Sequence, residues 1–341
     1  MSGFAARLIR WQKQRGRHDL PWQQTADPYR VWLSEIMLQQ TQVATVIPYY
    51  LRFLERLPTL ADLAAAPVEE IMALWSGLGY YARARNLHAC ARAIVEQHGG
   101  SFPRDPAAIA ELPGIGRSTA NAIADFCFGA RRPILDGNVK RVLCRCFGVE
   151  GFPGAPAVEK RLWEMAEELM PARDAAAYIQ AQMDLGATLC TRSGPRCREC
   201  PVAGQCVALR DGRTGELPQA KPGRALPERE TTVLVLRHGD GILVEQRPPQ
   251  GIWGGLLSLP ELPEGADPCR HAEALGCRAL SVRPLEPLAH SFTHFRLTLK
   301  PLLIEAEPTP HAAETGPRWL ARAQTKSAPL PAPIRKLLES L

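Results

Sequence analysis

Apolar residues recur at three- and four-residue steps along most of the chain between residue 28 and about residue 186, with Pro and Gly between the runs. This period predicts amphipathic helices of about 8 to 20 residues. The clearest runs are 28–47, 66–78, 84–100 and 105–129. Because no alternating pattern interrupts them, this part of the chain is predicted to be all-helical.

The pattern changes after residue 210. Residues 211–228 are rich in Gly, Pro and charge and have almost no apolar periodicity, as is typical of a linker. Beyond them TTVLVLR and ILVEQR flank HGDG, HSFTHFRLTLKPLLIEA is a further β-rich run, and APIRKLLESL predicts a short final helix. The sequence therefore predicts a multidomain protein, with an all-α domain in 1–210 and an α+β domain in 229–341.

Length and charge bound the class of protein. A chain of 341 residues fits about two domains. No apolar run approaches the roughly 20 residues of a membrane span, and the start of the sequence has no apolar signal-peptide core. A cytoplasmic location is therefore expected, in association with the nucleoid if the source is bacterial. The net charge of +6 permits a polyanionic partner without requiring one.

Four of the ten cysteines lie close together in CTRSGPRCRECPVAGQC. Their thiolates are soft ligands, and the short gaps allow the loop to wrap one metal centre. A zinc knuckle and four unrelated buried cysteines are the alternatives, although zinc sites usually have two C-x-x-C pairs and this loop has one. The C-x6-C-x2-C-x5-C spacing resembles the 4Fe-4S loop of the endonuclease III superfamily. That resemblance implies a cluster held by Cys190, Cys197, Cys200 and Cys206, and leaves Cys90, Cys127, Cys144, Cys146, Cys269 and Cys277 as expected buried thiols.

The segment LPGIG connects two helical runs and includes Leu112, Gly114 and Gly116. Two glycines in one turn permit positive φ and close backbone approach, and the amides that begin the next helix are free to meet an anion. This arrangement predicts a helix-hairpin-helix that grips a DNA backbone. Taken alone, the motif is equally well explained by a plain tight turn.

Two carboxylates are candidates for chemistry. Asp136 lies about 20 residues past the hairpin, where the endonuclease III superfamily has its reacting acid, and a helix N-cap is its alternative role. Glu35 lies in VWLSEIMLQQTQVATVI, which is predicted as one helix with Trp32, Glu35, Gln39 and Gln42 on one face. That polar stripe is either solvated or faces a cleft and contacts bases.

Five motifs together resemble those of the MutY-type adenine DNA glycosylases: DLPWQ, VWLSEIMLQQTQV, GLGYYARARNL, LPGIGRSTA and ILDGNVKRVL. The resemblance covers about residues 11–206, and the C-terminal domain also fits. It implies removal of adenine mispaired with 8-oxoguanine or guanine in double-stranded DNA, by a monomeric base excision repair enzyme. It also implies two helical subdomains, about 27–132 and about 1–26 with 133–210, with the substrate cleft between them.

The same resemblance assigns roles to individual residues. It makes Glu35 the acid that protonates adenine N7 and then assists water. Asp136 would stabilise the oxocarbenium-like sugar or bond to it transiently, with retention of configuration, and Asn138 would steady the sugar and Asp136. Gln42 and Tyr80 would fill the gap left near the mispaired purine when the adenine is flipped out. Leu20, Trp22 and Gln180 would line the adenine pocket, near His18, to which no role is assigned.

One position bears on whether the enzyme also has a lyase activity. Bifunctional members of the superfamily have a lysine two residues after the hairpin glycine, and this chain has Ser118, whose hydroxyl cannot form an imine. A monofunctional glycosylase without an efficient lyase step is expected.

The C-terminal domain resembles the NUDIX-like 8-oxoguanine-recognition domain of the same family. A NUDIX hydrolase needs an acidic cluster for Mg²⁺, and the equivalent stretch here has only Glu273, so that activity is expected to be lost. Phe292, Thr293 and His294 match the loop that meets 8-oxoguanine, with Thr293 in place of the usual serine. A NUDIX phosphohydrolase with a DNA-binding extension and a non-catalytic mismatch-binding module are the alternative functions. The missing acidic cluster counts against the first, and the presence of both Glu35 and Asp136 counts against the second.

Overall fold

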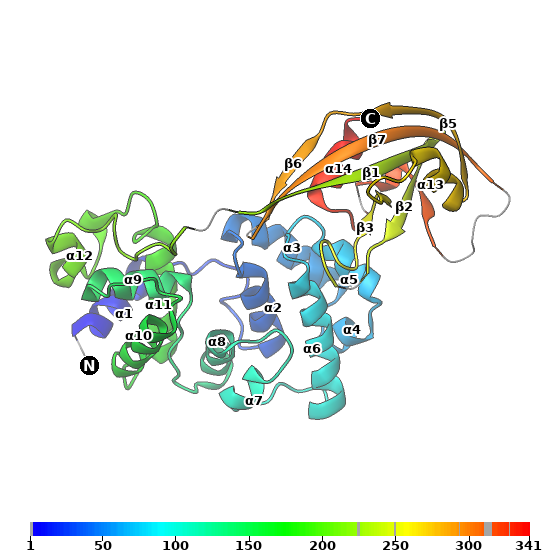
Figure 1. Cartoon of the computed structure of the whole chain (residues 1–341). Coiled ribbons are helices and arrows are strands. Elements are labelled where there is room, and N and C mark those ends of the chain that lie inside the picture. Colours follow the sequence, from blue (N-terminus) through cyan, green and yellow to red (C-terminus); the bar gives the residue numbers. More distant parts are fainter. Residues whose placement is uncertain (1–2, 224–225, 249, 293, 310–315, 327) are drawn as a thin grey trace. The chain divides into compact units, whose positions relative to one another are not determined.

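The computed structural model describes residues 3–223, 226–248, 250–292, 294–309, 316–326 and 328–341 (Figure 1). The chain divides into two compact units, each described here by itself. Unit 1 comprises Met1–Ala65 and Asn86–Gly223, and unit 2 comprises Ala66–Arg85 and Arg224–Leu341.

Unit 1 is helical, as the 3.6-residue period predicts, and the structure shows no strand among residues 3–223. Its elements are α1 (Gly3–Arg15), α2 (Pro28–Leu38), α3 (Val43–Arg56), α4 (Leu60–Ala65), α6 (Ala82–His98, which begins in unit 2), α7 (Pro106–Ala110), α8 (Arg117–Phe128), α9 (Gly137–Phe147), α10 (Pro156–Glu168), α11 (Ala175–Thr188), η1 (Cys197–Glu199), η2 (Ala203–Gln205) and α12 (Val207–Arg210).

The prediction of one helix over 28–47 is wrong. Helix α2 ends at Leu38, and α3 begins only after Gln42, which is its N-cap. Between them Gln40 has a φ of 56°, a left-handed conformation that cannot continue the helix. The proposed stripe is therefore interrupted between α2 and α3. Its first member, Trp32, is fully buried.

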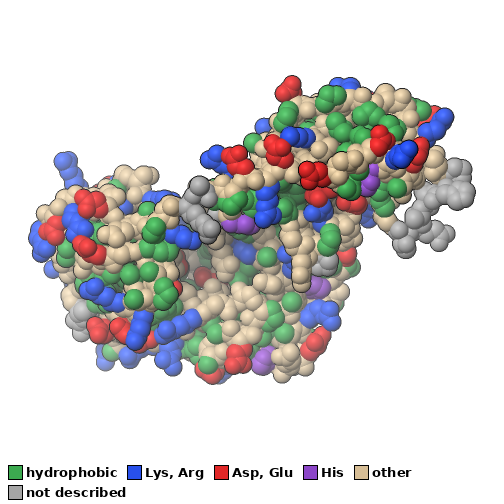
Figure 2. All heavy atoms as spheres, viewed as in Figure 1, with side chains coloured by type: hydrophobic (Ala, Val, Ile, Leu, Met, Phe, Trp, Pro, Cys, Tyr) green, Lys and Arg blue, Asp and Glu red, His purple; other side chains and the backbone are tan. Residues whose placement is uncertain are grey.

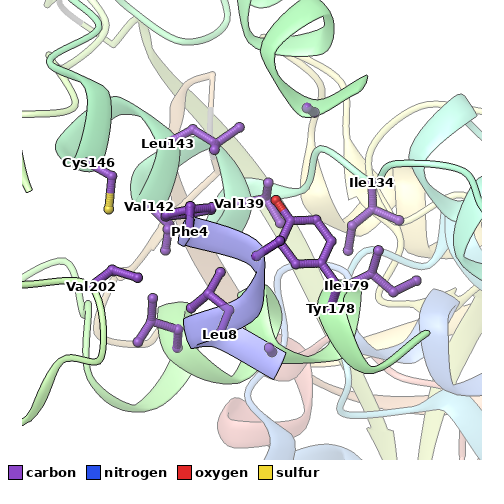
Figure 3. Close-up of a cluster of buried hydrophobic side chains, with 14 of the residues drawn as sticks. Phe4, Leu8, Ile134, Val139, Val142, Leu143, Cys146, Tyr178, Ile179 and Val202 are labelled. Atoms are coloured by element: carbon purple, nitrogen blue, oxygen red, sulfur yellow. The ribbon is translucent and has the colours of Figure 1, made fainter. Parts of the chain in front are cut away.

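Helix α1, which was not among the predicted runs, packs into a core whose other residues come from much later in the sequence. Figure 3 shows Phe4 and Leu8 pointing into a cluster that includes Val139 and Tyr178, from α9 and α11. The rings of Phe4 and Tyr178 meet edge to face, with 6.5 Å between centroids. The first helix thus packs with the chain segment that contains Asp136 and the cysteine loop.

Unit 2 is built on a sheet with the order β3-β2-β1-β7-β5, in which β4 pairs with β1, β6 with β7 and β8 with β2. The central pair, β1 and β7, is parallel. The two β-rich runs that flank HGDG, β1 and β2, pair antiparallel. The elements are α5 (Val68–Trp75), β1 (Glu228–His238), β2 (Gly241–Gln246), β3 (Leu257–Ser258), β4 (Glu261–Leu262), α13 (Pro268–Ala274), β5 (Cys277–Pro284), β6 (Leu288–Ser291), β7 (Arg296–Pro308), β8 (Arg318–Ala321), η3 (Arg322–Gln324) and α14 (Ala332–Glu339).

The α+β character of the C-terminal region is therefore as predicted. Its core includes Leu234 and Leu236 of β1 and Ile304 of β7, packed against Ala272 of α13. The sequence did not indicate that residues 66–85, which include α5 and Tyr80, belong to the same compact unit as the sheet. The expected linker and subdomain boundaries stay predictions.

Candidate active site

A cavity of about 320 Å³ lies in unit 1, within the range of about 300–1,000 Å³ typical of small-molecule pockets. Glu35, Leu20, Trp22 and Gln180, four residues predicted to act together, all line it. They come from α2, from the loop after α1 and from α11. His18 also lines the cavity, and its Nε2 lies 2.8 Å from the Gln12 carbonyl oxygen.

The carboxyl group of Glu35 is the perturbed group in this cavity. Burial, together with the negative charge of Asp136, raises its pKa to about 7. Val31, Leu38 and Phe126 provide apolar walls near it. At neutral pH a substantial fraction of Glu35 therefore carries a proton, as a general acid requires.

Asp136 is the N-cap of α9, so the alternative role proposed for it is real. Its Oδ1 accepts a hydrogen bond from the Val139 amide at 2.7 Å, and its Oδ2 accepts one from Asn138 Nδ2 at 3.1 Å. Burial raises the pKa of Asp136, but both hydrogen bonds favour the ionised form and oppose that rise. Since the Asp136 charge also affects the pKa of Glu35, capping and a place in the reaction centre are compatible.

Arg141 is a residue of this site that sequence reasoning missed. Its Nη2 donates to Asn138 Oδ1 at 2.9 Å and to the Gly186 carbonyl at 2.8 Å, and its Nε donates to the Cys190 carbonyl at 2.7 Å. Gly186 is required there, because a Cβ would lie 2.5 Å from Asn138 Cβ. In the sequence, only the three-residue spacing of Asn138 and Arg141, which places both on one helix face, could have indicated their contact.

A second missed network holds Gln180 at the cavity. Gln180 Nε2 donates to Asp184 Oδ1 at 3.0 Å, and Asp184 is fully buried. Arg17 compensates that buried charge with an ion pair of 2.7 Å to the same oxygen. The Gln180 amide is thus oriented by a paired carboxylate rather than free to rotate.

The hairpin between α7 and α8 has the conformation that its glycines suggested at one position. Gly114 has a φ of 75° and passes so close to Asn86 that a Cβ would lie 2.6 Å from the Asn86 Cβ. Gly116 caps α8 with ordinary extended backbone, and Leu112 is buried beneath the turn. Ser118 Oγ accepts a hydrogen bond from the Leu135 amide at 3.0 Å, directly before Asp136.

The four clustered cysteines line one small cavity, together with Arg145 and Cys146. Buried Arg145, which sequence reasoning missed, directs Nη1 to Cys190 Sγ at 3.4 Å and to the Thr191 carbonyl at 2.7 Å. Among the described residues no group of Cys, His, Asp or Glu is arranged around a single ion. The four thiols and the cation beside them fit an anionic iron–sulfur cluster, in which each thiolate binds a different iron.

The expectation that the other six cysteines are all buried is wrong at two positions. Cys269 is exposed and Cys127 is half-buried, whereas Cys90, Cys144, Cys146 and Cys277 are buried. Cys269 is the second residue of the short helix α13, where its side chain faces solvent rather than the sheet.

The remaining predicted residues are not among those that line the cavity. Gln42 is exposed at the start of α3. Tyr80, in unit 2, is 47% exposed and has a φ of 50°, with the Arg83 guanidinium 5.5 Å from its ring centroid. Phe292 is half-buried and His294 is exposed, whereas Thr293 lies outside the described residues.

Comparisons with known proteins were made for the whole chain. Residues 33–168 match the model of the HhH-GPD superfamily of base excision DNA repair proteins, and residues 231–340 match the NUDIX domain model. The chain is 33% identical over 342 residues to an adenine DNA glycosylase of Buchnera aphidicola (subsp. Acyrthosiphon pisum), covering 99% of this chain and 97% of the relative. The chain belongs to the adenine DNA glycosylase family. The human adenine DNA glycosylase is 34% identical over 402 residues, with coverage of 99% of this chain and 73% of the human protein.

The helical fold of this adenine DNA glycosylase family member is also found in solved structures. A thermostable thymine-DNA glycosylase has a TM-score of 0.56 at 30% identity, covering 61% of this chain and 95% of its own. None of the described helices is both long and apolar enough to cross a lipid bilayer. On the face drawn in Figure 2, Lys and Arg side chains alternate with Asp and Glu, in keeping with the modest net charge of +6.

Proposed function

We propose that this protein removes adenine mispaired with 8-oxoguanine or guanine from double-stranded DNA, by hydrolysis of the N-glycosidic bond. Membership of the adenine DNA glycosylase family supports the adenine-specific glycosylase reaction in base excision repair. The mechanism rests on one observation. The Glu35 carboxyl group lines the cavity and has a pKa of about 7, to which the negative charge of Asp136 contributes.

The two carboxyl groups have different environments and therefore different tasks. Glu35, in its apolar surroundings, donates a proton to adenine N7, so that the base leaves as a neutral molecule. Asp136 is stabilised as an anion by the Val139 amide and by Asn138, and it offsets the positive charge that develops on the sugar. After adenine departs, the Glu35 carboxylate accepts a proton from the attacking water.

The cavity suits a flipped-out base. A base in the duplex is inaccessible, so the enzyme must extrude it into a pocket before catalysis. Leu20 and Trp22 are buried apolar residues of the wall, and the oriented Gln180 amide offers both a donor and an acceptor. Trp22 is itself fixed edge-on to Tyr50, with 5.3 Å between ring centroids.

The enzyme acts as a monofunctional glycosylase in this proposal. The Ser118 hydroxyl is engaged with the Leu135 amide, and Lys140, on α9, is paired with Glu159 at 2.6 Å. Among the described residues lining the cavity there is no lysine. Borohydride should trap little protein–DNA adduct with the wild type, and Ser118→Lys should increase the trapped fraction. Efficient trapping by the wild type would contradict this assignment.

Cys190, Cys197, Cys200 and Cys206 are the residues that would hold a 4Fe-4S cluster. When bound, the cluster would crosslink the loop that follows α11. Anaerobically purified protein should contain iron and sulfide, and Cys200→Ala should lose most of the iron. Cys277→Ala, a buried cysteine of unit 2, is the matched control and should retain it. Stoichiometric zinc without iron would overturn the cluster assignment.

A single-turnover glycosylase assay tests the function as a whole. Duplexes with adenine opposite 8-oxoguanine, guanine or thymine are incubated with excess enzyme, and alkali reveals the abasic sites. Excision is expected opposite 8-oxoguanine and guanine, with the A:T duplex left intact. Absence of excision from all three duplexes by iron-replete protein would contradict the proposal.

A further inference from the structure

A cluster of aromatic rings in unit 2 includes Phe292, a residue of the expected 8-oxoguanine loop. Phe292 stacks on Phe295 at 4.5 Å between centroids and meets His290 edge-on at 4.7 Å. Trp253 lies 5.8 Å from Phe292 and 6.0 Å from His290. Burial lowers the pKa of His290, which favours the neutral ring. Phe292 itself is half-buried.

Trp253 occupies an unusual backbone conformation. Its φ is 54°, and the turn around it also contains Gly251 and Gly255 with φ values of 90° and 75°. A bulky residue in the left-handed region is strained and persists only where its surroundings fix it, and such strain is concentrated at functional sites. Trp253 is nonetheless only 9% exposed, so the strained turn directs its ring inward against Phe292.

The other side of the turn contacts the segment that contains Tyr80. Arg85 Nη1 donates to the Gly254 carbonyl at 2.6 Å, next to Trp253. A Cβ on Gly255 would meet Met72 and Arg85 at 3.8 and 3.9 Å, so these side chains already touch the turn. The turn is therefore packed between residues 66–85 and the rings behind Phe292, all within unit 2.

We propose that the turn Gly251–Gly255 positions Phe292 and that Trp253 determines how strongly the enzyme prefers adenine opposite 8-oxoguanine over adenine opposite guanine. This inference rests on the proposed function. A ring that is already fixed loses little conformational entropy when it contacts a purine, so bracing Phe292 strengthens discrimination without adding a contact. Arg85 holds the turn, and through it Trp253, in this arrangement.

The test compares single-turnover excision from A:8-oxoguanine and A:guanine duplexes at saturating enzyme. Trp253→Ala should reduce the ratio of the two rates about fivefold, mainly by slowing A:8-oxoguanine excision, since aromatic pairs contribute beyond their buried area. Trp253→Phe should recover most of the ratio. In Trp253→Ala/Phe292→Ala the losses should be less than multiplicative, because the two residues act as one unit.

Two further variants separate positioning from general destabilisation. Trp319→Ala removes a ring that packs on His238 in the same unit, 5.9 Å between centroids, and should keep the ratio unchanged even if it lowers the Tm. Arg85→Met keeps the stem but removes the donor to Gly254, and should reduce the ratio about twofold, the effect of losing one net hydrogen bond on an otherwise folded turn. An unchanged ratio in folded Trp253→Ala and Arg85→Met would overturn this inference, whereas a wild type that excises no adenine would overturn the proposed function instead.

Discussion

The cavity around Glu35 and the ring cluster around Phe292 differ in the kind of interaction they provide. Glu35 lines the cavity, and burial raises the pKa values of both Glu35 and Asp136. Paired charges such as Arg17 and Asp184 orient polar atoms there. The ring cluster consists of aromatic groups, with a half-buried face. In the proposed function, bond cleavage depends on charge in unit 1, while the choice of mispair depends on shape and packing in unit 2.

The largest expected effect is on Glu35. Glu35→Gln preserves the size of the side chain but removes the transferable proton, so excision from both mispairs should fall by about 10³-fold, within the range for loss of a general acid. Single-turnover rates on the two duplexes measure this. The exposed Glu55→Gln on α3 is the control and should react at the wild-type rate. A Glu35→Gln enzyme that changed only the ratio between mispairs would remove the distinction between the two regions.

Two variants of Asp136 separate the effect of its negative charge from its role as the N-cap of α9. Asp136→Asn retains an oxygen for the Val139 amide, so excision should fall by about 10²-fold or more while the Tm changes little. Asp136→Ala should lose the rate and about 1 kcal/mol of stability as well, because it removes the N-cap. Rates and thermal unfolding of both variants provide the comparison. Equal loss of stability in the two variants would mean that the charge, not the cap, stabilises α9.

The pH dependence of excision should follow Glu35. Because the acid form is required and its pKa is about 7, the rate should fall by about tenfold per pH unit above neutrality and level off below it. A second decline at acidic pH is expected where Asp136 takes up a proton. Rates measured from pH 5 to 9 should give the same profile for both mispairs, since the ring cluster takes no part in proton transfer. Different profiles for the two duplexes would contradict this.

Two smaller effects concern recognition. One should be equal for both mispairs, and the other should be confined to A:8-oxoguanine. Gly114→Ala places a Cβ against Asn86 in a strained conformation, so DNA affinity should weaken severalfold and equally for both mispairs, as expected when phosphate contacts are disturbed. Phe292→Ala should instead weaken only the A:8-oxoguanine complex. Binding isotherms with Glu35→Gln as the inactive background measure both. A change in preference caused by Gly114→Ala would show that the hairpin also reads the mispair.

The smallest effect is a gain in stability. The pKa of Glu35 is raised from 4.5 to about 7 on folding, so the native state holds its proton more tightly and stability falls as pH rises between these values. Glu35→Gln removes this cost and should stabilise the protein by roughly 1–3 kcal/mol at pH 8, with little change at pH 4. Thermal or denaturant unfolding at the two pH values tests this. Equal effects at both pH values would contradict burial as the cause of the shift.

Sequence patterns predicted the helical and α+β regions because periodicity is a local property. They failed at Gln40, where a left-handed residue splits two helices without Gly or Pro to mark it. The site was predicted through motifs, which identified Glu35 and Asp136 but not Arg141 and Arg145. The contacts of these two arginines lie mainly some 45 positions further along the chain, and one residue's sequence neighbours do not reveal partners at that distance. The roles of the predicted site residues stay predictions.

The grouping of residues 66–85 with the sheet was equally invisible, because it depends on contacts such as that between Arg85 and Gly254, 169 positions apart. Helix α5 and the Tyr80 loop have ordinary helical and turn sequences and nothing in them indicates their neighbours. Tertiary packing, rather than local preference, decides which unit such a segment joins.

The packing of α1 has a consequence for how the protein is made. Phe4 and Leu8 find their partners in α9 and α11, so during synthesis α1 cannot complete the burial of its apolar face until both of these later helices have been made. Helices α2, α3, α7 and α8, with nearer partners, can assemble earlier. The half of the catalytic centre that contains Asp136 is therefore expected to form last in unit 1, which keeps the enzyme incomplete until the cysteine loop is in place.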